Sequence, residues 1–375
     1  MNWIRDNILK LVVILVIIIV AIVIVSLFAG GGGSEPTVTA TGYEELENKL
    51  QAAAINYAKD HKDLRPTTVE KPIRIKLATL IDGRYIGEIH AIENSNTVCT
   101  GYVDIILKEE GKEDYKLVPH LICGNYYETS TIKDYIIKKD VVTSGDGLYQ
   151  DGNGYVYKGD YPTNNIMIGD VRYRILSITD DGYLKLLSTN DTVGRYIWDD
   201  RYNIDVDKLV GINTYNVSRM KENLEYLYSS TSDENDDEIY FTDDEREYMV
   251  EYPFCVGKLN PEDPTINPKA ECAETSIQKV GLMNVSDYFK ISTSANCKDT
   301  STYDCNNYNY LFDTGIIVTM NASSQNTYDY LIIKDGEIKP VESKSGNILS
   351  LVIYIEGSNV FVSGEGTRED PYIIR

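Results

Sequence analysis

The hydrophobic pattern is strongest near the N-terminus, where residues 11–29 (LVVILVIIIVAIVIVSLFA) carry no charge. A helix of this length spans roughly 28 Å, which is close to the hydrocarbon thickness of a bilayer. Only a helix satisfies its own backbone hydrogen bonds in lipid, so the many β-branched residues do not argue for a strand. The segment therefore predicts a transmembrane helix.

Basic residues lie on one side of this segment, since Arg5 and Lys10 precede it and the next basic residue is Lys49. The positive-inside rule then places the N-terminus in the cytoplasm and residues 30–375 outside the cell. The alternative is a cleaved secretory signal, whose apolar region is about 7–15 residues long and ends in a small-x-small site. Leu27 stands where that site needs a small residue, which favours an uncleaved anchor.

A helical pattern follows in residues 37–61. Thr41 and Glu44 have the spacing of a capping box. Apolar residues then recur at steps of three and four, at Tyr43, Leu46, Leu50, Ala53, Ala54, Tyr57 and Ala58. We expect an amphipathic helix that ends before Pro66 and covers a sheet. That sheet is predicted from the alternating residues 73–77 and from two strands, 101–107 and 115–123.

The Gly-rich stretch 143–154 (TSGDGLYQDGNG) predicts a domain boundary. Beyond it the pattern is mainly that of short strands, at 155–158, 165–168, 171–178, 183–187, 316–319, 328–333, 348–355 and 359–362. Helices are expected over 215–228 and from the cap residue Thr242 onward.

The expected organisation therefore has three parts. Residues 1–34 hold a cytoplasmic stub, the transmembrane helix and a GGGGS tether, which is a flexible sequence type. Residues 35–142 form a small α+β domain, and residues 143–375 form a β-rich extracellular domain. The predicted fold class is a membrane-anchored α+β protein.

The net negative charge of the chain argues against two classes of binding partner. The net charge is −22 and the pI is near 4.6, which argues against nucleic acid, because nucleic-acid binding needs a basic face. The same charge argues against adhesion of the ectodomain to anionic lipid. The acidic stretch 232–238 (SDENDDE) is interpreted as a solvated loop. A loose calcium site is the alternative, although the stretch lacks the alternating ligands and the turn glycine of an EF-hand loop.

All six cysteines lie on the predicted outer side, and an even number in an oxidising compartment indicates three disulfides. Fifteen connectivities exist for six cysteines. We favour neighbours along the chain, Cys99–Cys123, Cys255–Cys272 and Cys297–Cys305. Cys99 and Cys123 flank the predicted hairpin, whose geometry brings its ends together. No C-x-x-C pair occurs and every histidine precedes residue 121, so no metal site is predicted.

Motifs of hydrolytic chemistry are missing from the sequence. Residues 143–375 contain no histidine, and no GxSxG, HExxH or phosphate-loop motif occurs. We therefore expect a non-enzyme with no catalytic residue and no cofactor. A carboxylate-based glycan hydrolase stays open as an alternative, because the chain has 58 acidic residues from which a catalytic pair could come. Nothing in the sequence marks which two of them would act.

Tyrosine is unusually frequent, with 30 residues against six Phe and two Trp. Tyrosines fill the cores and rims of β-rich domains, but they also supply binding faces. The late loops, roughly 286–330, combine them with Asn, Ser and Thr beside the expected Cys297–Cys305 bridge. The candidate ligand-binding residues are Tyr303, Asn306, Asn307, Tyr308 and Tyr310. The expected ligand is an extracellular protein or a glycan.

Residues 8–141 resemble a type IV pilin-like prepilin in their apolar helix, amphipathic continuation and small antiparallel sheet with a late disulfide. The processing motif of that family, Gly followed by Phe and Glu, is missing. The resemblance therefore implies a pilin-like spacer domain. A pseudopilin-like structural or assembly component is the second functional alternative.

Several ordered motifs mark residues 143–375, among them GDGLY (145–149), YVYKGDYPTNNI (155–166), KVGLMNVSDY (279–288) and GEGTREDPYII (364–374). Together they resemble an uncharacterised domain family of surface proteins from low-GC Gram-positive bacteria. That resemblance implies a C-type-lectin-like fold with binding loops in its second half. The expected function is a single-pass, surface-anchored binding or adhesion module of the cell envelope.

Overall fold

The computed structural model describes residues 42–68, 71–108, 110–192, 194–230, 240–263, 267–297 and 303–375. The expected membrane segment 11–29, its tether and the acidic stretch 232–238 lie outside these ranges. No helix within the described ranges is long and apolar enough to cross a membrane. The chain divides into two compact units, Met1–Leu46 and Glu47–Arg375. Of the first unit only residues 42–46, the start of helix α2 (Gly42–Asp60), are described.

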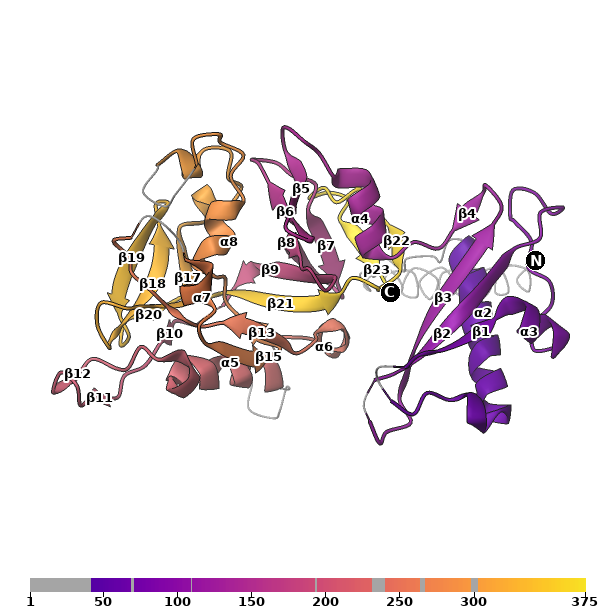
Figure 1. Cartoon of the computed structure of the whole chain (residues 1–375), viewed down its shortest axis with the longest axis horizontal. Helices are drawn as coiled ribbons and strands as arrows, with labels where there is room; N and C mark the ends of the chain where they lie inside the picture. Colours follow the sequence, from indigo (N-terminus) through magenta and orange to yellow (C-terminus); the bar gives the residue numbers. More distant parts are fainter. Residues whose placement is uncertain are drawn as a thin grey trace, which may run out of the picture. The chain divides into compact units, whose positions relative to one another are not determined.

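A small antiparallel sheet follows helix α2, in the strand order β1-β2-β3-β4. Its strands are β1 (Ile73–Lys76), β2 (Thr100–Leu107), β3 (Tyr115–Cys123) and β4 (Tyr127–Glu128). Every second residue of β2 from Val103 onward is buried, as expected for a strand with one covered face. Figure 1 shows α2 lying along this sheet, and Gln51 of α2 donates to the Leu117 carbonyl of β3 at 2.9 Å. The predicted helix and hairpin are confirmed.

The large sheet of the C-terminal part runs in the order β16-β21-β9-β8-β7-β23-β22, with the hairpin β5-β6 joined to β8 through β6. Its strands are β5 (Gly147–Asp151), β6 (Gly154–Lys158), β7 (Asn165–Ile168), β8 (Val171–Ile178), β9 (Tyr183–Asp191), β16 (Val280–Gly281), β21 (Ser350–Glu356), β22 (Phe361–Ser363) and β23 (Tyr372–Ile374). Strands β7 and β23 pair in parallel, although about 200 residues separate them. The predicted strands are therefore present, and the chain is α+β.

A second sheet, in the order β14-β17-β18-β19, stands beside the large one in Figure 1. Its strands are β14 (Lys258–Leu259), β17 (Ile316–Ser323), β18 (Asp329–Lys334) and β19 (Glu337–Glu342). Shorter pairs are β10 (Tyr196–Ile197) with β20 (Gly346–Asn347), β11 (Tyr202–Asn203) with β12 (Lys208–Leu209), and β13 (Tyr252–Cys255) with β15 (Thr275–Gln278). Among the described residues β17 extends four positions beyond the strand predicted at 316–319.

The helices of this part are short and capped. They are α4 (Ile132–Asp140), α5 (Arg219–Ser229), α6 (Asp243–Tyr248), α7 (Pro268–Glu271) and α8 (Val285–Lys290). Thr242 and Glu245 form the predicted capping box of α6. The helix predicted over 215–228 starts later, because Ser218 caps it and residues Tyr215–Val217 form a 3-10 turn instead.

The core of the C-terminal part is rich in tyrosine. The rings of Tyr157, Tyr173, Tyr215, Tyr288, Tyr330 and Tyr372 are fully buried, and Trp198 packs against two of them, Tyr215 and Tyr330. Their hydroxyls find buried partners, as when Tyr157 and Tyr372 both donate to Asp140 at 2.5 and 2.6 Å. These tyrosines therefore serve the core. Ile132 and Ile136 of α4 belong to the same core, while the domain boundary at 143–154 stays a prediction.

All six cysteines are paired as Cys99–Cys123, Cys255–Cys272 and Cys297–Cys305. The predicted connectivity is confirmed. In the first bridge the β2–β3 register places the two ends of the hairpin side by side, with Cα atoms 4.1 Å apart.

Candidate functional site

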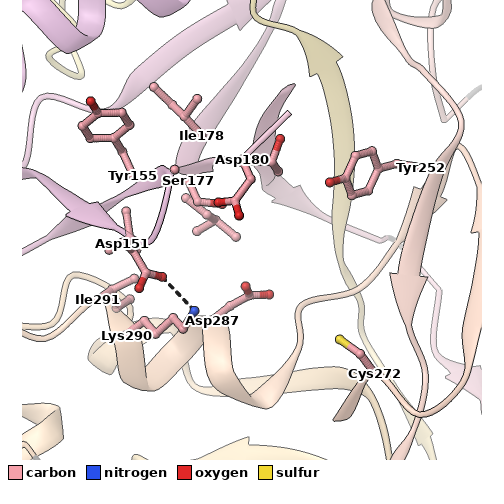
Figure 2. Close-up of a pocket in the computed structure, with 14 residues that line it drawn as sticks. Asp151, Tyr155, Ser177, Ile178, Asp180, Tyr252, Cys272, Asp287, Lys290 and Ile291 are labelled. Carbon is pink, nitrogen blue, oxygen red and sulfur yellow. Dashed lines mark hydrogen bonds and ion pairs between the residues drawn. The ribbon is translucent and has the colours of Figure 1, made fainter. Parts of the chain in front are cut away.

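A pocket of about 450 Å³ opens between the β5–β6 hairpin, strand β8, strand β13 and helix α8. Its polar lining includes Asp151, Tyr155, Ser177, Asp180, Tyr252, Asp287 and Lys290. Figure 2 shows Asp180 and Tyr155 on the side of β6 and β8, with Asp287 and Lys290 on α8 opposite them. The pocket therefore brings together carboxylates and aromatic rings from four separate stretches of the chain.

The tight turn after β8 places Asp180 at the pocket. Asp180 precedes Asp181 and Gly182, and Gly182 has φ 90°, a conformation that suits glycine. Gly154 allows β6 to approach this turn, since a Cβ there would lie 2.4 Å from the Ile178 carbonyl oxygen. The Asp180 side chain is exposed and makes no hydrogen bond or ion pair with any residue that the structure describes. It is available to accept hydrogen bonds from a ligand.

Tyr252 stands at another edge of the pocket. Its ring stacks on Tyr354 at a centroid distance of 3.9 Å and meets the edge of Tyr183 at 5.5 Å. Its hydroxyl donates to Asp181 Oδ1 at 3.2 Å. Neighbours thus hold the ring in place, so it offers a pre-oriented apolar surface.

The α8 side of the pocket carries two ion pairs of very different burial. Lys290 Nζ lies 2.8 Å from Asp151 Oδ2, and both side chains are about half exposed. Lys185, which is 5 % exposed, contacts Asp287 Oδ2 at 2.5 Å behind the pocket wall. Burial by itself lowers the pKa of Lys185, but the adjacent Asp287 carboxylate and the Tyr354 hydroxyl together outweigh burial and raise the pKa above the ordinary value.

Asp287 also accepts a hydrogen bond from the Asn284 backbone at 2.7 Å, as part of the α8 capping box. Its carboxylate therefore has two partners within the protein. Asp287 fixes the start of α8, whereas Asp180 remains open to a ligand.

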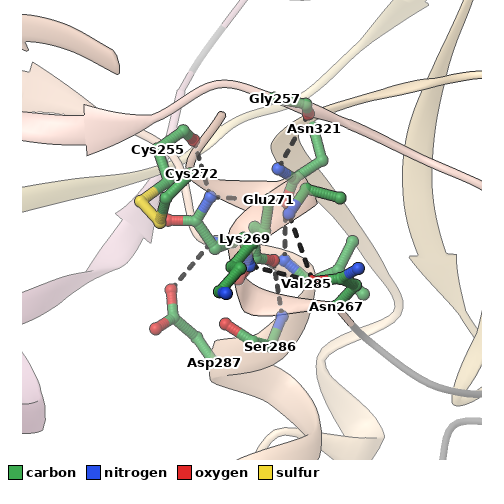
Figure 3. Close-up of a disulfide and its surroundings, with 12 residues drawn as sticks. Cys255, Gly257, Asn267, Lys269, Glu271, Cys272, Val285, Ser286, Asp287 and Asn321 are labelled. Atoms are coloured by element: carbon green, nitrogen blue, oxygen red, sulfur yellow. Dashed lines mark hydrogen bonds between the residues drawn. A yellow bond between two sulfur atoms is a disulfide. The ribbon is translucent and has the colours of Figure 1, made fainter. Parts of the chain in front are cut away.

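The Cys255–Cys272 disulfide forms a wall of the same region, and Cys272 itself lines the pocket. Figure 3 shows the disulfide beside the start of α8. The cap residue of α8, Asn284, donates through Nδ2 to the Cys255 carbonyl at 2.7 Å. Glu271 is buried just before Cys272 and accepts from the Ser286 backbone at 3.0 Å. Burial raises the pKa of Glu271 above its ordinary value, and the Ser286 hydrogen bond offsets this only in part.

The residues predicted from sequence to bind a ligand do not share one environment. Asn306 is buried and accepts from the Tyr288 hydroxyl at 3.0 Å, so it supports the core. Asn307 is exposed and donates to Asp304 at 3.2 Å, and Tyr308 is 58 % exposed. Tyr310 lies under the Arg174 guanidinium, 4.2 Å from its ring centroid. Tyr303 lies in the turn Tyr303–Asn306. Ligand binding by these five residues stays a prediction.

The residues around the pocket were missed in the sequence because no local signal unites them. Asp180 was visible only as part of a hairpin turn, and Asp287 only as a residue near a late loop. Within the described ranges no group of three or more His, Cys, Asp and Glu could hold a metal ion.

Comparison with known proteins finds no match. No family model fits the sequence, and no curated protein or solved structure matches the chain.

Proposed function

We propose that this chain is a surface-anchored extracellular protein whose C-terminal part binds a glycan in the pocket beside α8. The observation that carries the proposal is the combination of an open carboxylate, Asp180, with the rings of Tyr155 and Tyr252 around one cavity. Sugar hydroxyls donate to carboxylates, and the apolar faces of sugar rings pack on aromatic side chains. A polar, open pocket of this kind suits a polyhydroxylated ligand better than an apolar one.

The proposed location rests on two features. Three disulfides favour an oxidising compartment. The apolar segment 11–29 would anchor the chain by a single pass, with the basic residues before it in the cytoplasm. Protease added to intact cells should then digest residues 30–375, and full protection of the C-terminal part would contradict this orientation.

Two fold resemblances belong to the same proposal. Helix α2, the small antiparallel sheet and its closing disulfide support a pilin-like spacer between anchor and binding part. In the C-terminal part, early strands are followed by helices α5 and α6 and then by a hairpin-rich half, an order that supports a C-type-lectin-like arrangement. Function follows from the pocket and not from these likenesses.

A glycan array probed with the full chain in detergent micelles tests the binding proposal, followed by calorimetric titration of the glycans retained. Asp180→Asn should weaken binding at least tenfold, because a neutral amide is a poorer acceptor than a carboxylate. Asp335→Asn is the matched control, because Asp335 occupies the Asp-Gly turn between β18 and β19, outside the pocket. Equal affinity of the native chain and Asp180→Asn for a retained glycan would mean that the glycan binds outside this pocket. If the array retains no glycan, the proposal is wrong.

The pocket also keeps a carboxylate-based glycan hydrolase as a second candidate. Asp180 and Asp287 come from opposite sides of the cavity, as a pair of catalytic carboxylates does. Incubation of each retained glycan with the protein, followed by mass spectrometry, separates the two functions. Shortened products that disappear with Asp180→Asn would indicate hydrolysis, and intact glycans would indicate binding alone.

A further inference from the structure

A second cleft, of about 560 Å³, lies away from the glycan pocket and shares no lining residue with it. Its lining includes Arg172 and Arg174 of β8, Arg368 of the loop before β23, and Tyr310. Three arginines in one cleft are unexpected in a chain with a net charge of −22.

The strand register explains why two of these arginines meet. Residues two apart on a strand point to the same face, so Arg172 and Arg174 share one side of β8, while Tyr173 and Ile175 are buried on the other. Arg174 stands opposite Asn165 of β7, which also lines the cleft. The sheet therefore presents two guanidinium groups side by side.

These three arginines form no direct ion pair with a carboxylate of the described residues, although acidic side chains also line the cleft. Arg174 donates through Nε and Nη2 to Asn164 Oδ1, at 3.2 and 2.9 Å, which is a neutral acceptor. The Nε atom of Arg172 is buried and has no hydrogen-bond partner among the residues that the structure describes. Neither Arg172 nor Arg368 forms a side-chain ion pair with any carboxylate in the part of the chain that the structure describes.

The pKa of Arg174 agrees with this geometry. Burial lowers the pKa of Arg174 below its ordinary value, the Tyr310 hydroxyl opposes that shift, and the nearby charge of Arg172 lowers the pKa further. Buried polar groups in folded proteins normally have partners, and the Arg172 guanidinium lines the cleft without an acceptor among the described residues, so an anion in the cleft can supply one.

We propose that this cleft binds the carboxylate group of an acidic sugar or a similar small monoanionic ligand. Guanidinium groups bind carboxylates through paired N–H···O hydrogen bonds. Asp160, Asp313 and Glu369 also line the cleft and would repel a polyanion, so a single negative charge with neutral hydroxyl groups fits best. The Tyr310 ring, which the Arg174 guanidinium covers, also lines the cleft.

Sodium glucuronate, glucose and inorganic phosphate are the probes, titrated calorimetrically into the full chain in detergent micelles at constant ionic strength. Glucuronate should bind at least tenfold more tightly than glucose, and Arg172→Gln and Arg174→Gln should each remove at least tenfold of that affinity. Arg195→Gln, the same substitution at an exposed position outside the cleft, should bind like the native chain.

Three outcomes would overturn the proposal: no preference for glucuronate over glucose, tighter binding of phosphate than of glucuronate, or unchanged affinity in both β8 variants. Arg368→Gln provides a variant on an exposed loop in case a β8 variant fails to fold, and it should lose affinity in the same direction. Asp180→Asn should keep glucuronate binding, which separates a failure of this cleft from a failure of the glycan pocket.

Discussion

Several charged side chains are buried in the C-terminal part, and Lys185 is the clearest case. Its ammonium group is buried against Asp287, and Asn284 Oδ1 lies 3.5 Å away as a further polar neighbour. A buried ion pair adds little net stability relative to apolar residues, but removal of one partner leaves an uncompensated charge. The pair therefore makes this wall of the pocket sensitive to single substitutions.

Lys185→Met should destabilise the protein by about 3 kcal/mol, because Asp287 would keep its charge without its cation. Lys290→Met removes a half-exposed ion pair and should cost at most about 1 kcal/mol. Urea unfolding followed by circular dichroism measures both values. Similar losses of stability in the two variants would mean that the buried ion pair of Lys185 matters no more for stability than the half-exposed pair of Lys290.

Glu271 should make stability depend on pH. Its pKa is raised in the folded state, so the unfolded state releases this proton first, near the ordinary value of 4.5. Stability from Glu271 is therefore present at lower pH and is lost as pH rises from about 4.5 through the raised folded value. Glu271→Gln keeps an acceptor for Ser286 and should be more stable than the native chain above that window.

The measurement is the difference in unfolding free energy between the native chain and Glu271→Gln, taken from pH 4 to pH 8. The variant should gain on the native chain as pH rises. A difference that stays constant with pH would show that Glu271 titrates alike in the folded and unfolded states.

At the scale of elements, hydrogen bonds of the capping residue determine where a helix begins, and α5 is an example. Ser218 accepts from the Lys221 backbone at 3.4 Å and donates to the Tyr215 carbonyl at 2.8 Å, which ends the 3-10 turn and starts α5. The apolar spacing of residues 215–228 cannot distinguish the turn from the helix, because Tyr215 is buried along with the helix face. The hydrogen bonds of the cap decide where α5 begins.

Ser218→Ala should lower stability by about 1 kcal/mol, the usual cost of losing an N-cap. Ser229→Ala, at the exposed last residue of α5, should change stability by less than about 0.5 kcal/mol. Thermal unfolding of both variants makes the comparison. A neutral Ser218→Ala would mean that the tertiary contacts of α5 hold its start without the cap.

At the scale of the whole molecule, the three disulfides each close a short segment, with sequence separations of 24, 17 and 8 residues. None of the three links the small sheet to the C-terminal part. Each bridge therefore stabilises the region that it closes, and no bridge holds the small sheet and the C-terminal part together.

Replacement of Cys99 and Cys123 together by alanine should lower stability by about 3.5 kcal/mol in the chain-entropy model. The Cys297–Cys305 double replacement should cost about 2.5 kcal/mol, because its loop is shorter. Denaturant unfolding measures the losses. Ligand binding to the glycan pocket should survive the first replacement, and its loss there would show that the small sheet supports the pocket.

The candidate site was much less predictable than the fold. Asn306 was chosen as a ligand-binding residue for its side-chain chemistry, yet it is buried against Tyr288. Tyr310 was chosen for the same reason, and its ring lies under Arg174, a residue 136 positions earlier. Side-chain type alone does not tell whether a tyrosine or asparagine faces solvent or the core.

The sequence by itself determined the local features of this protein. Periodicity predicted α2 and the β2–β3 hairpin, the spacing of Thr242 and Glu245 predicted a cap, and the short separations of the cysteines predicted their pairing. Each of these depends on interactions within a few to about twenty-five residues. Local free energies of that kind can be judged from a short window of sequence.

Only the tertiary structure decided the parallel pairing of β7 with β23 and the two cavities. Asp180, Tyr252 and Asp287 line one pocket because separate strands and a helix converge, and Arg172 and Arg368 line one cleft through the order of strands in the large sheet. Such contacts are set by packing between residues far apart in the chain. A pattern within one segment contains no information about which distant segment will lie beside it.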